Sequence, residues 1–253
     1  MSSLLALEGL SLSFRGIKAI DALDGEVERG AMLAIVGPNG AGKTSVLNCI
    51  SGFYRPQRGR IRFDGHDITE TPTHRRAALG IARTFQNVEI YSGMTVVDVI
   101  LSGRHLHMTS DLLRAGLFVG PCRREEVRNR GEVERIVDFL ELGSYRSAVA
   151  GALPAGIQKR VALGRALAME PTLLLLDEVT SGMSIEEKRD MARFIGEARA
   201  ERGLTVLLIE HDLSFVVGMA DRMLVMDYGR KIAEGPPEEV LRKPEVVAAY
   251  VGA

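Results

Sequence analysis

Short runs of apolar residues recur along the chain, and each ends at a polar residue or a glycine. The runs cover residues 31–36, 173–176, 204–209 and 223–227. Each is too short for a helix and carries no charge before its last residue, which is typical of a strand buried on both faces of a sheet. Because stretches with helical periodicity alternate with these runs, the pattern predicts an α/β fold with a largely parallel sheet flanked by helices.

Residues 88–164 depart from this pattern. They have little strand character, several helical periods and a charged block at 123–130. We therefore predict a single domain, in which residues 1–87 and 165–253 form the α/β core and residues 88–164 form an inserted α-helical subdomain. The charged block mixes both signs, which favours a solvated helix face over a patch that binds phosphate or lipid.

The charge balance argues against a nucleic-acid-binding protein. The 253 residues include 32 basic and 33 acidic side chains, a formal net charge of −1, whereas proteins that bind nucleic acid usually present a strongly basic face. The two cysteines, Cys49 and Cys122, are too few for a disulfide framework. We expect both to be structural thiols in a reducing compartment.

The N-terminal segment does not resemble a signal peptide, because it carries Glu8 and lacks both a basic stretch and a long apolar stretch. No apolar run approaches the ~20 residues that are needed to cross a bilayer. We expect a soluble chain whose membrane role, if it has one, depends on partners.

A glycine-rich segment directly follows the first buried run and opens a helix predicted at 41–50. Residues 37–44 read Gly-Pro-Asn-Gly-Ala-Gly-Lys-Thr and fit G-x-x-x-x-G-K-[ST] at every fixed position. In this strand–loop–helix context, backbone N–H groups converge on phosphate oxygens, Lys43 reaches the β- and γ-phosphates, and the Thr44 hydroxyl ligates Mg²⁺. The predicted ATP-binding residues of this segment are Gly37, Pro38, Asn39, Gly40, Ala41, Gly42, Lys43, Thr44 and Ser45.

Two adjacent acids, Asp177 and Glu178, close the second apolar run. One carboxylate can support Mg²⁺ while the next polarises the attacking water. A phosphate-binding loop alone leaves GTPases, kinases and motor ATPases open, but GTPases and nucleoside kinases do not usually carry this tandem pair. We therefore predict an ATPase in which Asp177 supports the metal and Glu178 is the general base.

The order of these motifs resembles an ABC (ATP-binding cassette) ATPase along essentially the whole chain. The resemblance implies an antiparallel β subdomain beside the P-loop core, and ATP hydrolysis between two cassettes. Further matches are Phe14 at the aromatic position that stacks on adenine, Gln86 of the Q-loop, the signature segment at 153–167, the D-loop at 181–184, and the switch histidine His211.

The resemblance also implies a role for each match. Gln86 contacts Mg²⁺ and the attacking water, and His211 contacts the γ-phosphate. The signature loop, at Pro154, Ala155 and Gly156, contacts the ATP of a second subunit. Phe14 has an alternative interpretation as a core residue.

Two positions depart from the family pattern. The signature usually begins Leu-Ser-Gly-Gly-Gln, but here Pro154 replaces the serine whose hydroxyl is expected to contact the partner's γ-phosphate. Gly156 and the start of the following helix still offer backbone donors. Val179 stands where a proline commonly follows the tandem acids, and this change touches no reacting group.

Within the family, the segments at 80–87 and 228–235 are similar to the ATPase subunits of branched-chain amino acid importers. That similarity implies two multi-span permease subunits, a second ATPase subunit (itself or a paralogue) and, indirectly, a secreted solute-binding protein. It also implies a place at the cytoplasmic face of a bacterial inner membrane. The alternatives are a non-transport ABC ATPase and a nucleotide-binding regulator that hydrolyses weakly, the latter suggested by Pro154. No residue of this chain is expected to touch the transported solute.

Overall fold

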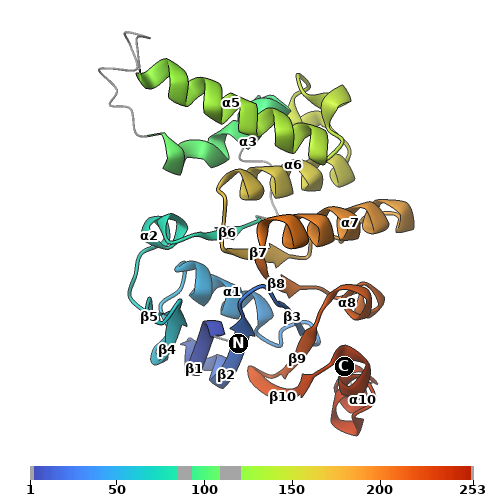
Figure 1. Cartoon of the computed structure of the whole chain (residues 1–253). Coiled ribbons are helices and arrows are strands. Elements are labelled where there is room, and N and C mark those ends of the chain that lie inside the picture. The colour runs from blue at the N-terminus through green and yellow to red at the C-terminus, as the bar shows by residue number, and fades with distance from the viewer. Residues whose placement is uncertain (1–2, 85–92, 109–120, 252–253) are drawn as a thin grey trace. The chain divides into compact units, whose positions relative to one another are not determined.

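The computed structural model describes residues 3–84, 93–108 and 121–251 (Figure 1). Contacts between residues divide the chain into two compact units. Unit 1 comprises residues 1–83, 172–181 and 195–253, and unit 2 comprises residues 84–171 and 182–194. None of the helices in these described ranges is both long and apolar enough to cross a membrane. The subdomain boundaries at 88 and 164 stay a prediction.

Unit 1 is built on a six-stranded sheet in the order β10-β9-β3-β8-β7-β6, in which only β10 runs antiparallel to its neighbour. The strands are β3 (Met32–Val36), β6 (Ile81–Arg83), β7 (Leu173–Asp177), β8 (Thr205–Ile209), β9 (Arg222–Asp227) and β10 (Arg230–Gly235). The four predicted apolar runs become β3, β7, β8 and β9. Every residue of β3, β7 and β8 is buried, as expected for strands covered on both faces.

The second sheet of unit 1 is antiparallel and has the order β2-β1-β4-β5. Its strands are β1 (Ser3–Phe14), β2 (Ile17–Glu28), β4 (Arg58–Phe63) and β5 (His66–Asp67). The mixture of a parallel and an antiparallel sheet confirms the predicted α/β fold with an antiparallel part.

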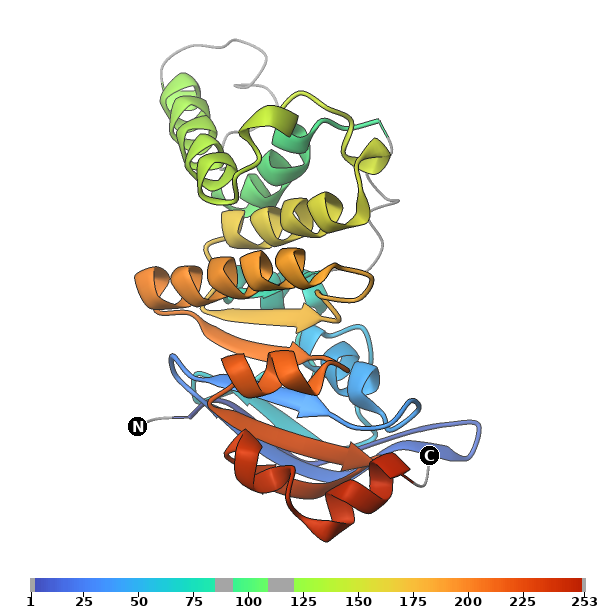
Figure 2. The ribbon, with the colours of Figure 1, turned by 90° about the vertical axis from the view of Figure 1, so that its right-hand side faces the viewer.

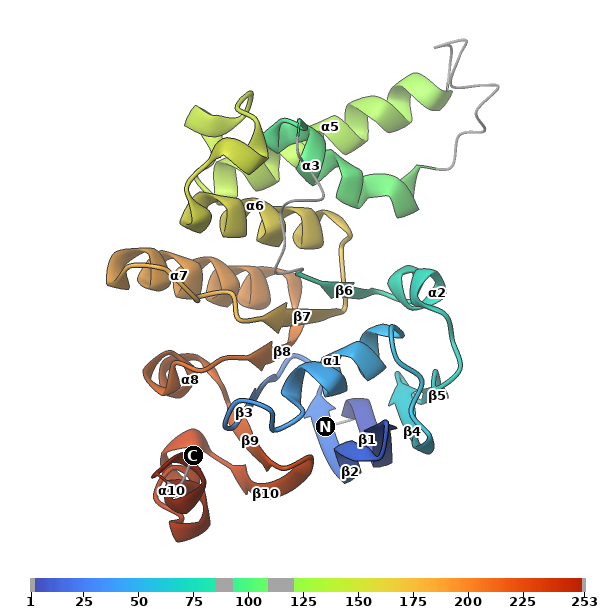
Figure 3. The same cartoon turned by 180° about the vertical axis from the view of Figure 1, so that it is seen from behind.

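Among the described residues, five helices belong wholly to unit 1, and Figure 2 and Figure 3 give two further views of the chain. They are α1 (Lys43–Ser51), α2 (Thr73–Ala78), α8 (Leu213–Met219), α9 (Pro237–Val240) and α10 (Pro244–Val251). The buried side chains Val46, Leu47 and Ile50 of α1 join one apolar cluster with residues from both sheets. Helix α1 is therefore packed between the sheets, and its N-terminus continues directly from the loop after β3.

Helix α1 begins two residues later than the predicted position 41. Gly42 lies just before it with a φ of +100°, which interrupts the helical backbone. Gly52 ends the helix in the left-handed region, with its N–H directed at the carbonyl oxygens of Asn48 and Cys49. Both helix ends therefore rest on a glycine that accepts a positive φ at little cost.

The described residues of unit 2 form helices, and their only strand-like contact is an isolated bridge between Thr95 and Val149. The helices are α3 (Val96–Ser102), η2 (Gly103–His107), α5 (Pro121–Phe139), η3 (Gly143–Tyr145), η4 (Ala150–Ala152) and α6 (Ala155–Ala168). Helix α7 (Ile185–Arg202) has its first ten residues in unit 2 and the rest in unit 1. A Cβ atom added at Gly103 would lie 2.2 Å from the carbonyl oxygen of Arg165, so η2 and α6 pack with their backbones in direct contact.

The burial of Cys49 in α1 generates a prediction about its thiol. Burial raises the pKa of Cys49 to about 12 from an ordinary value of 9.0, and the nearby Arg76 lowers it only in part. The thiolate is the reactive form, and roughly one thiol in ten thousand is ionised at pH 8 in the folded protein. In a Cys122→Ser background, we expect Cys49 to resist a thiol-specific chromogenic reagent at pH 8 until urea unfolds the chain.

The sign of the pH effect follows from the same shift. The folded-state pKa lies above the unfolded value, so the stability contributed by the neutral thiol is complete below pH 9 and is lost as the pH rises toward 12. Fast labelling of the native protein at pH 8 would contradict the buried position of Cys49.

Candidate nucleotide-binding site

The phosphate-binding loop runs from the end of β3 to the start of α1, in unit 1. A Cβ atom added at Gly37 would lie 2.0 Å from the carbonyl oxygen of Met226, and one at Gly42 would lie 2.1 Å from that of Ala19. Both distances are far below any real contact, so only glycine fits at these two positions. Gly40, between them, has a φ of +81°, and no atom of the described residues lies within 4 Å of its Cβ position. The loop is therefore tight at both ends and open at its exposed centre.

Lys43 turns back into this loop. Its Nζ donates hydrogen bonds to the carbonyl oxygens of Gly37 (2.7 Å) and Pro38 (2.8 Å), and the residue is only 5% exposed. Burial lowers the pKa of Lys43, while the negative charges of Glu178 and Asp177 act in the opposite direction. The predicted phosphate-binding lysine and both predicted acids thus lie within electrostatic reach of one another. The Thr44 hydroxyl belongs to an exposed residue in the first turn of α1.

The tandem acids stand where β7 ends, beside the end of β8. Asp177 is buried and pairs with Ile209 in the sheet register. Glu178 has a φ of +50°, and its N–H donates to the carbonyl oxygen of Ile209 at 2.9 Å. This turn directs the two side chains differently. The Oε1 atom of Glu178 lies 2.7 Å from Nε2 of His211, a hydrogen bond that the ring donates when the carboxylate is ionised.

Glu210 is a site residue that the sequence analysis missed. It is buried, at 2% exposure, and its Oε1 accepts a hydrogen bond of 2.8 Å from the N–H of Thr180. Its Oε2 accepts a second from the N–H of His211 at 3.3 Å. Glu210 therefore ties the loop after Glu178 to the loop that carries His211. The sequence did offer one signal for Glu210, because it is a charged residue that directly follows the apolar run 204–209.

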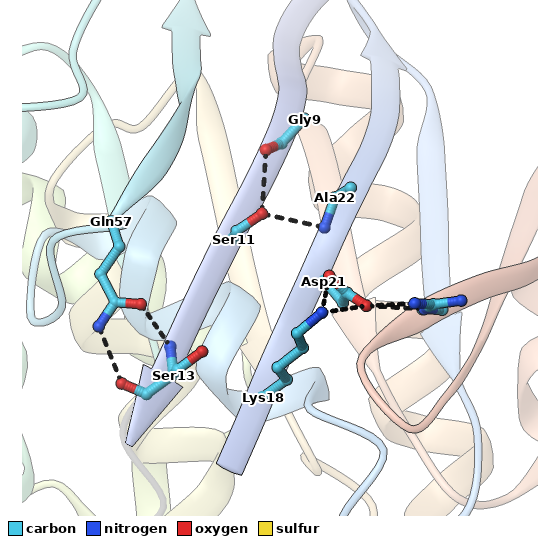
Figure 4. A network of polar contacts seen from close by, with 8 residues as sticks. Gly9, Ser11, Ser13, Lys18, Asp21, Ala22 and Gln57 are labelled. Carbon is cyan, nitrogen blue, oxygen red and sulfur yellow. Dashed lines mark hydrogen bonds and ion pairs between the residues drawn. The ribbon is translucent and has the colours of Figure 1, made fainter. Parts of the chain in front are cut away.

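Phe14 ends β1, and its side chain is partly exposed. Its ring meets the ring of Tyr54 edge to face, with 5.1 Å between the centroids. The hairpin that carries Phe14 is fixed by the Gln57 side chain, which donates to the Ser13 carbonyl at 3.0 Å and accepts from the Ser13 N–H at 2.9 Å (Figure 4). The aromatic residue thus has a defined position beside Tyr54, a contact that the sequence did not indicate.

The turn between β9 and β10 connects β2 to the phosphate-binding loop. The N–H of Gly229 donates to the carbonyl oxygen of Ala41 (3.0 Å), and the Gly229 carbonyl accepts from the N–H of Asp21 (2.9 Å). Figure 4 shows the Asp21 carboxylate beside Lys18 on β2. Hydrogen bonds from Arg230, then from Lys18, hold the pKa of Asp21 below its ordinary value. These contacts fix the loop's position through the backbone of neighbouring strands.

The signature residues lie in unit 2, at the start of α6. Pro154 is the N-cap residue and makes no side-chain cap hydrogen bond, so its side chain satisfies none of the backbone N–H groups in the first turn of the helix. The Nε2 atom of Gln158 donates to the carbonyl oxygen of Leu153 at 2.7 Å. A Cβ atom at Gly156 would meet Oε1 of Glu187 at 2.1 Å. Gln86, the predicted Q-loop residue, lies outside the described residues.

A parallel sheet with a glycine-rich loop, a buried lysine and tandem acids at its carboxyl edge defines a P-loop nucleotide hydrolase. A family model described as ABC transporter matches residues 20–181, more than half of the chain. The chain therefore belongs to the ABC transporter family, as one of its ATP-binding and ATP-hydrolysing cassettes.

The chain is also similar, over nearly its whole length, to ATP-binding proteins that are named for a particular transport. The chain is 38% identical over 250 residues to the high-affinity branched-chain amino acid transport ATP-binding protein BraF of Pseudomonas aeruginosa, with 98% of each chain covered. It is 34% identical over 254 residues to the corresponding protein LivG of Escherichia coli, again with 98% of each covered. Crystal structures of an ATP-binding cassette of an ABC transporter, nucleotide-free and in an ADP conformation, each match at a TM-score of 0.87 with 32% identity and full coverage of both chains.

The steric test of the loop is a comparison of two glycine variants. In Gly42→Ala the new methyl group must displace the Ala19 carbonyl, so we expect nucleotide affinity to fall at least tenfold. In Gly30→Ala, φ is also positive (+76°), but in the part of the chain that the structure describes no atom lies within 4 Å of the new methyl group. That control carries only the backbone strain of about 1–2 kcal/mol. Fluorescent ADP titration and urea unfolding measure both effects, and equal affinity of the two variants would contradict the close approach.

Proposed function

We propose that the chain is the ATPase subunit of an importer for branched-chain amino acids or similar small solutes. The supporting observation is full-length similarity, at 34–38% identity, to proteins named for that transport. The proposed partners are two multi-span permease subunits, a second ATPase subunit and, indirectly, a secreted solute-binding protein. The chain then works at the cytoplasmic face of the membrane, held there by the permeases.

The residues of unit 1 fit a nucleoside triphosphate with Mg²⁺. The glycine loop has an open centre, Lys43 supplies a positive charge, and the Thr44 hydroxyl and Asp177 carboxylate are oxygen ligands of the kind that Mg²⁺ prefers. Thr44, Asp177 and Gln86 are the proposed metal-supporting residues. When bound, Mg²⁺ neutralises charge on the phosphate oxygens. The glycine-loop residues 37–45 hold the phosphates, and Phe14 stacks on the base.

Glu178 is the proposed general base. Its carboxylate is fixed on one side by His211, and the left-handed turn at Glu178 separates its direction from that of Asp177. A carboxylate in this place accepts a proton from the attacking water or orients that water toward the γ-phosphate. His211, which is hydrogen-bonded to the proposed base, is the proposed group that senses the γ-phosphate.

The first turn of α6 is the proposed second half-site, which acts on the nucleotide of another subunit. Pro154 offers no hydroxyl there, so the proposed recognition depends on the backbone N–H groups of Ala155 and Gly156 and on the helix dipole. A single chain therefore needs a second cassette to complete a site. The missing hydroxyl also keeps open the second candidate, a regulator that binds nucleotide and hydrolyses it weakly.

The role of Glu178 is tested by Glu178→Gln, which keeps the shape of the side chain and removes its basicity. We expect ATP turnover to fall by ~10²–10⁴-fold while ATP still binds, and an ATP-loaded dimer to accumulate on size-exclusion chromatography. Glu238→Gln, an exposed acid in the first turn of α9, is the matched control. Unchanged turnover in Glu178→Gln would remove Glu178 from the mechanism, and negligible wild-type turnover would favour the regulator.

The transported solute is tested in cells. Deleting the gene should abolish energy-dependent uptake of radiolabelled leucine and isoleucine, and the wild-type gene should restore it. A Lys43→Ala gene, expressed to the same level, should fail to restore uptake because the lysine that faces the phosphates is lost. Uptake that survives the deletion would contradict the assigned solute class but leave the ATPase assignment intact.

A further inference from the structure

Arg83 lies at the last position of β6 and reaches the acid at the end of the neighbouring strand. In the sheet register Arg83 pairs with Leu175, and Asp177 follows two residues later on the same face of β7. The Nη2 atom of Arg83 donates to Oδ2 of Asp177 at 2.8 Å. The two side chains are 11% and 2% exposed, so this ion pair is largely removed from water.

Helix α1 holds the other side of the same guanidinium group. The Nη1 atom of Arg83 donates to Oδ1 of Asn48 at 2.7 Å and to Oγ of Ser51 at 3.2 Å. Its Cζ atom lies 5.9 Å from the centre of the Phe53 ring. Both of these hydrogen-bond acceptors on α1 are neutral, whereas Asp177 brings a carboxylate to the same guanidinium group. The planar guanidinium group of Arg83 therefore bridges helix α1 and Asp177, the first of the tandem acids.

This arrangement fixes the geometry of Asp177. An ionised carboxylate at this depth is costly without a counter-charge, and a guanidinium supplies one with a defined direction. Because Arg83 meets Oδ2, the orientation of Oδ1 is set as well. The positive charge of Arg83 and the negative charge of Asp177 cancel, so the ion pair does not repel Mg²⁺ by a net positive charge. It presents an oriented carboxylate oxygen instead.

We infer that Arg83 is a positioning residue for metal binding: anchored to α1 by Asn48, it orients the Asp177 carboxylate that supports Mg²⁺ beside the nucleotide. The inference rests on the proposed role of Asp177. It adds a residue that the sequence analysis quoted only within a family resemblance and to which it assigned no role. Through Arg83, hydrogen bonds link the Asp177 carboxylate to helix α1.

The experiment measures how much Mg²⁺ tightens nucleotide binding. For the purified full-length chain, the dissociation constant of a fluorescent ADP analogue is determined in EDTA and in Mg²⁺, and their ratio is the Mg²⁺ gain. In Arg83→Gln we expect the Mg²⁺ gain to fall about tenfold or more, as for other residues that orient a metal ligand. If the wild-type gain is itself less than about tenfold, we expect the gain of Arg83→Gln to fall to one, which means that Mg²⁺ no longer tightens binding. Affinity in EDTA should change little. Arg83→Lys keeps the charge but loses the planar fork, and should also lose most of the gain.

A second buried arginine provides the matched control. Arg76 is 1% exposed, and its acceptors among the described residues are all backbone carbonyls, including those of Cys49 and Ile50 on α1. Arg76→Gln should lower stability in urea yet leave the Mg²⁺ gain unchanged. If Arg83→Gln does not fold, Asn48→Ala replaces it; this variant keeps the charge, loses the 2.7 Å anchor and should show a partial loss of gain.

Each outcome shows whether or not Arg83 orients Asp177 for metal binding. A full Mg²⁺ gain in Arg83→Gln or, in its place, in Asn48→Ala would overturn the inference, as would a gain that rises because a repelling charge has been removed. Asp177→Asn separates this failure from that of the proposed function. If Asp177→Asn keeps the full gain, the metal role of Asp177 fails and the inference falls with it. If only Asp177→Asn loses the gain, Arg83 alone is excluded.

Discussion

Two backbone carbonyl groups press against the phosphate-binding loop at its ends, and the arrangement of unit 1 depends on this close approach. The Met226 oxygen occupies the place of a side chain at Gly37, and the Ala19 oxygen does the same at Gly42. Further backbone hydrogen bonds through Gly229 join the loop to β2 and to the β9–β10 turn. The cradle is therefore shaped by main-chain atoms of both sheets, so its form survives most changes of side chain but not the loss of either glycine.

Charged side chains are unusually well buried at the carboxyl edge of the six-stranded sheet. Lys43 is held by two carbonyl oxygens, Asp177 by Arg83, and Glu210 by two backbone N–H groups. Each contact offsets the cost of removing a charge from water. These contacts also stop the side chains from rotating, which suits a reaction whose catalysis is largely positioning and electrostatic stabilisation. The pair of Glu178 and His211 is more exposed, with 27% and 43% of the side chains accessible to solvent.

The two candidate half-sites belong to different compact units of the chain. The phosphate-binding loop and the tandem acids are in unit 1, while the first turn of α6 is in unit 2. In unit 2, η2 and α6 meet through backbone at Gly103, and Gly156 lies against the Glu187 side chain that caps the start of α7. Each half-site thus has its own local support, as required if they act on different nucleotides in a dimer.

The sequence alone determined four buried strands, β3, β7, β8 and β9, and the class of chemistry. Uncharged apolar runs have few alternatives to a buried parallel strand, and G-x-x-x-x-G-K-[ST] after such a strand specifies a phosphate cradle through residues that are adjacent on the chain. The start of α1 was predicted two residues too early, because the sequence pattern is helical from residue 41 whereas the positive φ of Gly42 delays the helix to Lys43.

What only the tertiary structure decided are the contacts between residues distant along the chain. The pairs of Arg83 with Asp177, Glu210 with Thr180, and Phe14 with Tyr54 join residues separated by 94, 30 and 40 positions. Neither periodicity nor a local motif records such partners, because the register of neighbouring strands and the packing of α1 bring them together. Local patterns therefore predicted the candidate reacting groups, and only the folded chain could show what holds them in place.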